Sequence, residues 1–304
     1  MTAPSIAPLP PVAARADRPA LGVLLMLGFC VTAPLSDALS KIAADDFPVL
    51  QLVLIRFAVQ VAILVPLVAI LRDGFAMSPT GWLLTAIRSA LQIAGIFLMV
   101  TGLTYLPLAD AIAIAFVMPF ILLLMGYLLM GEEVGPRRLI ACAVGFCGTL
   151  MVMQPAFEEV GWAVLYPLAV AFVFAAFMLV TRRLGREVGA LPMQANSGLI
   201  AVAALGVFYA AAPASPALTL APMAGHLPLL AAMGVLGTVG HLMMTWSLRH
   251  APASTLAPMQ YLEIPVAALI GLWLFGDWPN GLAMAGIAVT IATGLYILWR
   301  EARP

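Results

Sequence analysis

Seven Asp, Glu, Lys, Arg and His side chains fall inside long apolar runs of this sequence, where a charge is expensive. They are Asp37, Lys41, Arg56, Arg88, Asp110, His241 and Glu263. An ionisable residue in the middle of a membrane costs at least ~2.5 kcal/mol on insertion scales, so each is a candidate functional group. Carboxylates and guanidinium groups there could form a buried ion pair or bind a zwitterion, and an imidazole could carry a proton.

The apolar runs that hold these residues predict an all-α integral membrane protein of ten transmembrane helices. Hydrophobic residues make up 63% of the 304 residues and charged residues only 9%, against about 25% in a soluble domain. A span needs about 20 apolar residues. Pro, Gly and charge clusters divide the chain into ten such segments: 20–43, 48–71, 80–103, 107–130, 136–154, 160–181, 190–212, 227–248, 253–276 and 280–299.

The distribution of basic residues predicts the orientation. With the N-terminus inside, eleven of the 14 Lys and Arg residues lie in cytoplasmic segments and none lies in an outer connection. The Pro- and Ala-rich residues 1–18 are then a disordered cytoplasmic tail. Thirteen of the 14 are Arg, which is typical of a GC-rich bacterial genome. We therefore expect a multi-pass protein of the bacterial inner membrane with both termini cytoplasmic.

Two stretches of the sequence resemble each other: LPLADAIAIAFVMPFILLLMGYLLMGEEV, from Leu106, and APASTLAPMQYLEIPVAALIGLWLFGDW, from Ala251. Gly126 precedes Gly271 by 145 residues. This spacing predicts two repeats of five spans, residues 19–155 and 156–300. Because five is odd, the second repeat enters the membrane with opposite polarity, as in many secondary transporters.

With these ten spans in two halves, the sequence resembles the EamA-domain branch of the drug/metabolite transporter superfamily. The resemblance is carried by LIRF (Leu54 to Phe57), by LTYLPLADAIAIAFVMPF and by LLMGEEVGPRRLIACAVGFCGTLMV. It covers residues 20–300. It implies a carrier, within a range that includes exporters of amino acids and drugs and importers of riboflavin or S-adenosylmethionine. The GDWPNG stretch departs from the family's usual acidic-residue-then-Gln pattern after Gly276.

Depth along the helices predicts which of the ionisable groups meet. At 1.5 Å per residue, Asp37 lies about 9 Å from the outer end of its span, and Arg56 about 12 Å. These two residues could pair, although Lys41, one turn beyond Asp37, is an alternative partner. Lys41 also suits a helix C-terminus and is long enough to reach the outer surface. A purely structural ion pair and a role in proton coupling both stay open for this group.

A second group of residues lies toward the cytoplasmic side and joins the two predicted halves. Arg88 is about 12 Å and Glu263 about 15 Å from the cytoplasmic ends of their spans, so a contact between them would mark a transport site. The candidate substrate-binding residues are Arg88, Gln92, Phe116, Trp246, Gln260, Tyr261 and Glu263. His241 is a packing residue or a proton carrier. Asp110 is expected to cap the N-terminus of the fourth span.

The motif content argues against an enzyme and against a channel. The sequence contains no HExxH or GxSxG motif and no ring of like charges, and its three cysteines show no zinc-site spacing. We expect no metal, cofactor or nucleic acid, and a monomer or homodimer in lipid. The predicted function is secondary transport of a small metabolite by alternating access. A vitamin such as riboflavin and an amino-acid-like zwitterion both fit, while a drug exporter of broad specificity, a scaffold and a lipid scramblase are alternatives.

Overall fold

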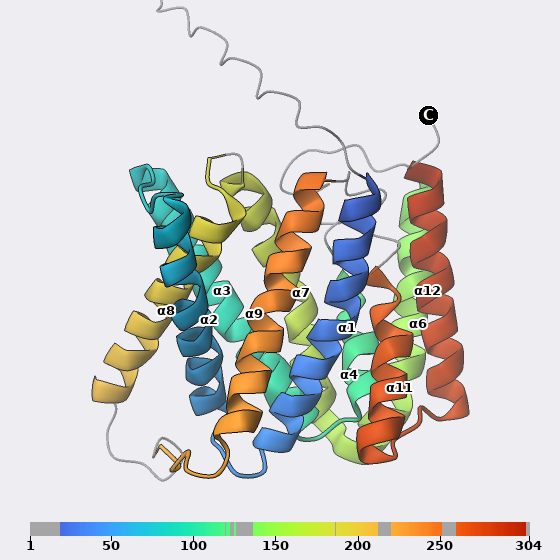
Figure 1. Cartoon of the computed structure of the whole chain (residues 1–304). Helices are drawn as coiled ribbons and strands as arrows, with labels where there is room; N and C mark the ends of the chain where they lie inside the picture. The colour runs from blue at the N-terminus through green and yellow to red at the C-terminus, as the bar shows by residue number, and fades with distance from the viewer. Residues whose placement is uncertain are drawn as a thin grey trace, which may run out of the picture.

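The computed structural model describes residues 19–118, 120, 121, 125, 136–185, 187–211, 220–250 and 260–301, and the regular structure in these ranges is helical (Figure 1). The elements are α1 Pro19–Ala43, α2 Val49–Leu71, α3 Pro79–Leu103, α4 Leu108–Ala115, α6 Pro136–Val160, the 3-10 turn η1 Gly161–Val164, α7 Leu165–Leu184, α8 Ala190–Ala211, α9 Leu227–His250, α11 Glu263–Phe275 and α12 Gly281–Glu301.

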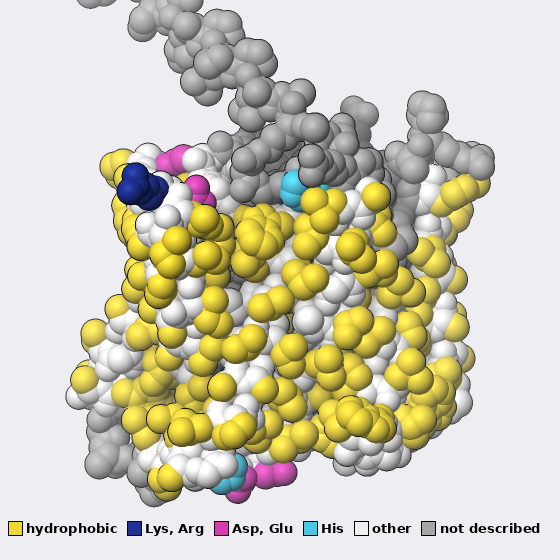
Figure 2. Space-filling view, viewed as in Figure 1, with side chains coloured by type: hydrophobic (Ala, Val, Ile, Leu, Met, Phe, Trp, Pro, Cys, Tyr) yellow, Lys and Arg dark blue, Asp and Glu magenta, His cyan; other side chains and the backbone are white. Residues whose placement is uncertain are grey.

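The described helices are those of an integral membrane protein. Six helical stretches are long and apolar enough to cross a bilayer, and Glu263–Phe275 and Gly281–Thr293 are shorter apolar helices. On the face shown in Figure 2, a broad hydrophobic band separates charged and His side chains at the two ends of the bundle. This band matches a protein whose sides face lipid and whose ends face water.

Several helix ends differ from the predicted segments. The α6 helix continues through Pro155 to Val160, so the expected connection after residue 154 is helical until Gly161, whose positive φ of 61° ends the helix. Of the predicted segments 107–130 and 253–276, the structure shows α4 and α11. The rest of each segment lies mostly outside the described residues. The predicted tail, residues 1–18, also lies outside them.

Helices of the two predicted halves pack in pairs: α1 lies beside α9, α3 beside α7, α2 beside α8, α4 beside α11 and α6 beside α12 (Figure 1). Glycines allow the closest approaches. A Cβ at Gly234 of α9 would lie 2.6 Å from Val59 Cβ on α2, and a Cβ at Gly286 of α12 would meet the carbonyl oxygen of Gly148 on α6 at 2.5 Å. Small residues at helix interfaces favour such packing in membranes.

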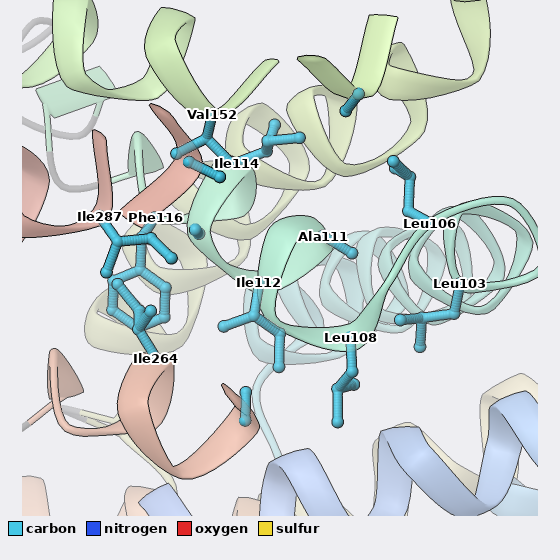
Figure 3. Close-up of a cluster of buried hydrophobic side chains, with 14 of the residues drawn as sticks. Leu103, Leu106, Leu108, Ala111, Ile112, Ile114, Phe116, Val152, Ile264 and Ile287 are labelled. Carbon is cyan, nitrogen blue, oxygen red and sulfur yellow. The ribbon is translucent and has the colours of Figure 1, made fainter. Parts of the chain in front are cut away.

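The largest buried cluster lies around α4, between the end of α3, α6, α11 and α12. Figure 3 shows Phe116, Ile264 and Ile287 side by side in this cluster, with Leu103, Leu106 and Leu108 farther along it. It occupies the end of the bundle that carries the α1–α2, α3–α4 and α11–α12 connections. Apolar packing therefore closes this end.

At the opposite end, the start of α3 is joined to the α7–α8 connection. Ser78 caps α3, because its hydroxyl oxygen accepts from the Gly81 N–H at 2.9 Å. The Ser78 N–H donates to Glu187 Oε1 at 2.8 Å, and hydrogen bonding from Ser78 lowers the pKa of Glu187. This contact ties two connections of different predicted halves at the surface.

Candidate functional site

A cavity of about 130 Å³ lies at mid-bundle, between elements of both predicted halves. Its walls come from α1, α2, α3 and the end of α4 on one side, and from α7, α9 and the start of α11 on the other. Its polar lining consists of Asp37, Arg56, Gln92, His241, Gln260 and Glu263. Its aromatic lining consists of Phe29, Phe116, Phe174 and Phe177.

The ion pair in the cavity wall joins α1 to α2. Arg56 Nη1 donates to Asp37 Oδ1 at 3.1 Å and to Ser40 Oγ at 3.2 Å. The absence of a side chain at Gly237 makes room for this arrangement, since a Cβ there would lie 3.1 Å from Arg56 Nη2. The predicted Asp37–Arg56 pair is confirmed, and the alternative pairing of Asp37 with Lys41 is wrong.

Lys41 instead bonds groups at the closed end of the bundle. Its Nζ donates to the Leu106 carbonyl at 2.8 Å, lies 3.7 Å from Asp277 Oδ2 and sits 4.9 Å from the ring centroid of Phe275. The side chain is only 21% exposed. The expected extension of Lys41 to the surface is therefore wrong, because three groups from neighbouring elements hold the ammonium within the protein.

The predicted cap of the fourth span is also wrong. Asp110 lies in the first turn of α4, but α4 shows no side-chain cap hydrogen bond and Pro107 occupies the N-cap position. Asp110 is buried, and its Oδ1 has no hydrogen-bond partner within the described ranges.

Arg88 is fully buried, and its guanidinium is bound by uncharged groups of two other helices, α7 and α8. Its Nε donates to Thr181 Oγ1 at 3.0 Å, Nη1 to Ser197 Oγ at 2.7 Å, and Nη2 to Gln194 Oε1 at 3.0 Å. The guanidinium also stacks on the Phe177 ring at 4.5 Å.

The predicted contact between Arg88 and Glu263 is not formed, although the structure describes both residues. Similar depth did not bring them together, because the side chain of Arg88 is turned toward α7 and α8 and away from α11. Arg88 bridges the two predicted halves without lining the cavity. Its burial requires every donor to be satisfied, and the hydroxyl and amide oxygens of α7 and α8 do this.

Gln92, Gln260, Glu263, Phe116 and His241 do line the cavity, so five of the expected residues are brought together there with the ion pair. Gln92, one helical turn beyond Arg88, lies on the same face of α3, with Arg88 Nη1 3.5 Å from Gln92 Oε1. Besides Arg88, two of the expected binding residues do not line the cavity. Trp246 packs on the cluster around Leu64 and Leu191, and Tyr261 is buried against the Phe116 ring at 5.4 Å.

Sequence reasoning missed three of the four aromatic wall residues, Phe29, Phe174 and Phe177. Phe174 and Phe177 are stacked at 5.5 Å with an interplanar angle of 19°, and Phe177 meets the His241 ring at 6.4 Å. Phenylalanines in apolar runs resemble lipid-facing ones. The only available signal was the spacing of Phe174 from Phe177, one turn of a helix.

The backbone of two facing helices is interrupted beside the cavity. The α4 helix ends at Ala115, with a turn at Phe116 and Val117. A turn at Tyr261 and Leu262 separates Gln260 from the start of α11 at Glu263. Phe116 and Tyr261 are 145 residues apart, the offset of the sequence repeat, and their rings are in contact.

A family model described as the EamA-like transporter family matches the chain twice, over residues 20–154 and 161–299. The chain belongs to the EamA-like transporter family. As an EamA-family protein it is similar to a riboflavin transporter of Rhizobium johnstonii, with 31% identity over 71% of this chain and 70% of the relative. It is also similar to an S-adenosylmethionine uptake transporter of Rickettsia prowazekii, with 21% identity over 92% of this chain and 93% of the relative.

Two further comparisons agree with these. A riboflavin transporter of Vibrio cholerae is 24% identical over 94% of this chain and 95% of the relative. A protein crystal structure shares the fold with a TM-score of 0.63, covering 94% of this chain and 99% of that chain at 18% identity. Together with the apolar helices, family membership identifies an integral membrane transporter for a small metabolite.

Proposed function

We propose that this EamA-family protein carries a flat, ring-bearing metabolite of the riboflavin type across the bacterial inner membrane. The observation that carries the proposal is the cavity, which combines four phenylalanine rings with unpaired polar groups at mid-bundle. Aromatic walls with a few placed polar groups are typical of sites for small ring-bearing molecules. The similarity to a riboflavin transporter supports this substrate class.

Transport would proceed by alternating access of two inverted halves of five spans each. The two separate family matches support division near residues 155–160, close to the predicted division into residues 19–155 and 156–300. The packing pairs support an approximate two-fold relation, because exchanging the halves converts α1 beside α9 into α7 beside α3 and leaves α2 beside α8 unchanged. The paired breaks at Phe116 and Tyr261 lie where such an axis would pass.

A second candidate substrate is a cation of the S-adenosylmethionine type. The cavity contains two carboxylates, Asp37 and Glu263, and one guanidinium, that of Arg56. Since Arg56 is already paired with Asp37, Glu263 is the carboxyl group of the cavity that remains to bind a cationic substrate. Relatives named S-adenosylmethionine uptake transporters agree with this possibility. An exporter of broad specificity and a non-transport scaffold are less consistent with so small and specific a polar lining.

The test is binding and uptake by purified protein in vesicles. Riboflavin should raise the unfolding temperature, because a ligand that binds only the native state stabilises by RT ln(1 + [L]/Kd). Unlabelled riboflavin loaded inside the vesicles should accelerate the uptake of labelled riboflavin from outside by exchange. S-adenosylmethionine and amino acids tested in parallel separate the candidates, and a response to S-adenosylmethionine alone would replace riboflavin with the second candidate.

A matched pair of glycine variants separates loss of the site from loss of folding. Gly95 lines the cavity, and a Cβ there would meet only Val173 within 4 Å, at 3.6 Å. Gly95→Leu should fill the cavity and abolish riboflavin binding while the protein stays folded. Gly206→Leu, at a helical glycine with nothing within 4 Å of an added Cβ, should leave binding unchanged. Full binding by the Gly95 variant would place the site elsewhere.

A further inference from the structure

The amide of Gln92 is held in one orientation by a residue outside the cavity. Arg88 Nη1 lies 3.5 Å from Gln92 Oε1. A guanidinium has donors only, so the amide oxygen must face it and the NH₂ group must face away. Three other buried hydrogen bonds hold Arg88 itself in place. Gln92 is therefore set to present donors, and not its acceptor, to the cavity that it lines.

These donors have no acceptor within the part of the chain that the structure describes. Gln92 is 5% exposed, and its Nε2 is among the buried polar atoms without a hydrogen-bond partner there. Leaving a buried donor unpaired is unfavourable, and native proteins seldom do so without a functional reason. A carbonyl oxygen or ring nitrogen of a ligand in the cavity would satisfy it.

Glu263 supplies the complementary group from the opposite half. Its side chain lines the same cavity at the first position of α11, and within the described ranges it forms neither an ion pair nor a hydrogen bond. The other carboxylate of the cavity, Asp37, is already bonded to Arg56. A carboxyl oxygen accepts hydrogen bonds in either protonation state, so Glu263 can take an N–H group of a ligand.

The rings around these two groups fit a flat molecule. Phe174 and Phe177 on α7 form a stacked pair, and Phe29 and Phe116 lie on other sides of the cavity. Aromatic rings pack on planar heterocycles in offset or edge-to-face geometry. A planar ligand between them would turn its polar edge to Gln92 and Glu263.

We propose that Gln92 and Glu263 together bind the edge of a heterocyclic ring in which a carbonyl group lies next to an N–H group. Arg88 is the positioning residue for Gln92. The proposal rests on the proposed function and names the edge by which the substrate is selected. In riboflavin this edge is the imide of the pyrimidine ring, where one N–H lies between two carbonyl groups. Gln92 would donate to a carbonyl oxygen, and Glu263 would accept from the N–H.

The experiment compares riboflavin with its N3-methyl derivative, which keeps both carbonyl groups and loses the N–H. Inhibition of riboflavin uptake in vesicles gives an affinity for each compound. The wild-type protein should bind the methylated compound at least about tenfold more weakly, because one buried hydrogen bond is lost and its acceptor on Glu263 is left unpaired. A flavin altered only at the benzenoid end is the control and should bind within about threefold of riboflavin.

Substitutions then assign the two contacts. In Glu263→Met the preference for riboflavin over the methylated compound should fall to nearly one, because the group that reads the N–H is gone. In Gln92→Met both compounds should weaken equally and the preference should persist. If the effect of N3-methylation on affinity disappears in the Glu263 variant and persists in the Gln92 variant, the N–H group contacts Glu263 directly. A variant that fails to fold would show no binding of either flavin, so Glu263→Gln serves as the second, nearly isosteric substitution, and it too should lower the preference.

Arg88→Lys tests the positioning role. Lysine keeps the charge but cannot make the several bonds of a guanidinium, so the amide of Gln92 would rotate. Uptake should show a KM several-fold higher with kcat nearly unchanged, whereas a purely structural role would lower the amount of folded protein without changing KM.

The outcomes separate this proposal from the proposed function. Equal binding of riboflavin and its N3-methyl derivative to the wild-type protein would overturn the edge assignment and leave riboflavin transport intact. Unchanged preference in both Glu263 variants would also overturn it. Absence of any riboflavin binding to the wild-type protein would overturn the proposed function and the edge assignment that rests on it.

Discussion

At the scale of single residues, Arg88 and Arg56 show two ways to keep a cation inside an apolar bundle. Arg56 is neutralised by Asp37, whereas Arg88 is satisfied by hydroxyl and amide oxygens and by the Phe177 ring. The first arrangement leaves the ion pair in the cavity wall. The second uses the charge to connect α3 to α7 and α8, and it fixes a neighbouring amide.

The Asp37–Arg56 pair predicts a strong effect of removing one partner. The two side chains are 15% and 8% exposed, so Asp37→Asn leaves a largely buried guanidinium without its counter-charge. Breaking a buried pair in this way costs about 3–5 kcal/mol. We expect a lower unfolding temperature and poor accumulation of Asp37→Asn, with partial recovery in the Asp37→Asn, Arg56→Gln double variant.

The control for this prediction is Asp45→Asn, which changes an exposed carboxylate at the α1–α2 connection and should leave the unfolding temperature unchanged. Normal stability of Asp37→Asn with lost transport would show instead that the carboxylate acts in transport and not in folding.

Sequence reasoning found some of these residues because charges and amides in apolar runs are conspicuous. Asp37, Arg56, Gln92, Gln260 and Glu263 were all selected in this way, and all line the cavity. Their partners were harder to predict. Depth along a helix follows from residue counting, but the direction of a side chain depends on helix rotation, which no pattern in a nearly uniform apolar helix encodes. The Arg88–Glu263 prediction failed for this reason.

At the scale of elements, the glycines of α9 set how closely it packs. Gly234 lies against Val59 of α2, and Gly240 lies against Thr32 of α1, where a Cβ would be 2.8 Å from Oγ1. The sequence places Gly234, Gly237 and Gly240 three residues apart, along one edge of a helix. It did not show which helices the edge faces, because neighbours across the halves are far apart in sequence.

Gly234→Ala is expected to push α9 away from α2. The new Cβ would lie 2.6 to 2.9 Å from three carbon atoms of Val59, a branched side chain attached close to its backbone, which cannot swing aside. Overpacking of this kind costs about 1–3 kcal/mol. Thermal unfolding in detergent should show the loss, together with weaker riboflavin binding.

Gly206→Ala provides the matched control within α8, where an added Cβ meets nothing within 4 Å. This variant should be as stable as the wild-type protein or slightly more so, because alanine is the better helix former. If the two alanine variants unfold alike, close packing of α9 on α2 is not a source of stability.

At the scale of the whole molecule, the two predicted halves are interleaved and not merely adjacent. Each of the packing pairs joins one half to the other, and the cavity takes its walls from both. The end of the bundle near Leu106 is closed by apolar packing, and Lys41 on α1 reaches Asp277 between α11 and α12 across it. Opening that end would require the halves to separate and this ion pair to break.

The side of the membrane on which Trp162 lies tests the proposed count of ten spans. The apolar stretch Ala143–Thr181 contains 39 residues and spans α6, η1 and α7. As one straight helix it would be about 58 Å long, roughly twice the hydrocarbon thickness, so the stretch fits two crossings that turn at η1. Trp162 in η1 is 75% exposed, and two crossings would place it on the outer side of the membrane.

Single cysteines introduced into a variant without Cys30, Cys142 and Cys147 would show, by their labelling, on which side of the membrane each connection lies. With a membrane-impermeant maleimide on intact spheroplasts, we expect labelling at positions 46, 105, 162 and 278. Positions 72 and 187, in exposed connections at the other end of the bundle, should react only after permeabilisation. This pattern follows from ten spans with cytoplasmic termini, since the basic residues of the connections gather on one side. The reverse pattern would invert the orientation. Labelling of position 162 on the same side as 187 would mean that α6 and α7 do not each cross the membrane, and the inverted five-helix halves would be wrong.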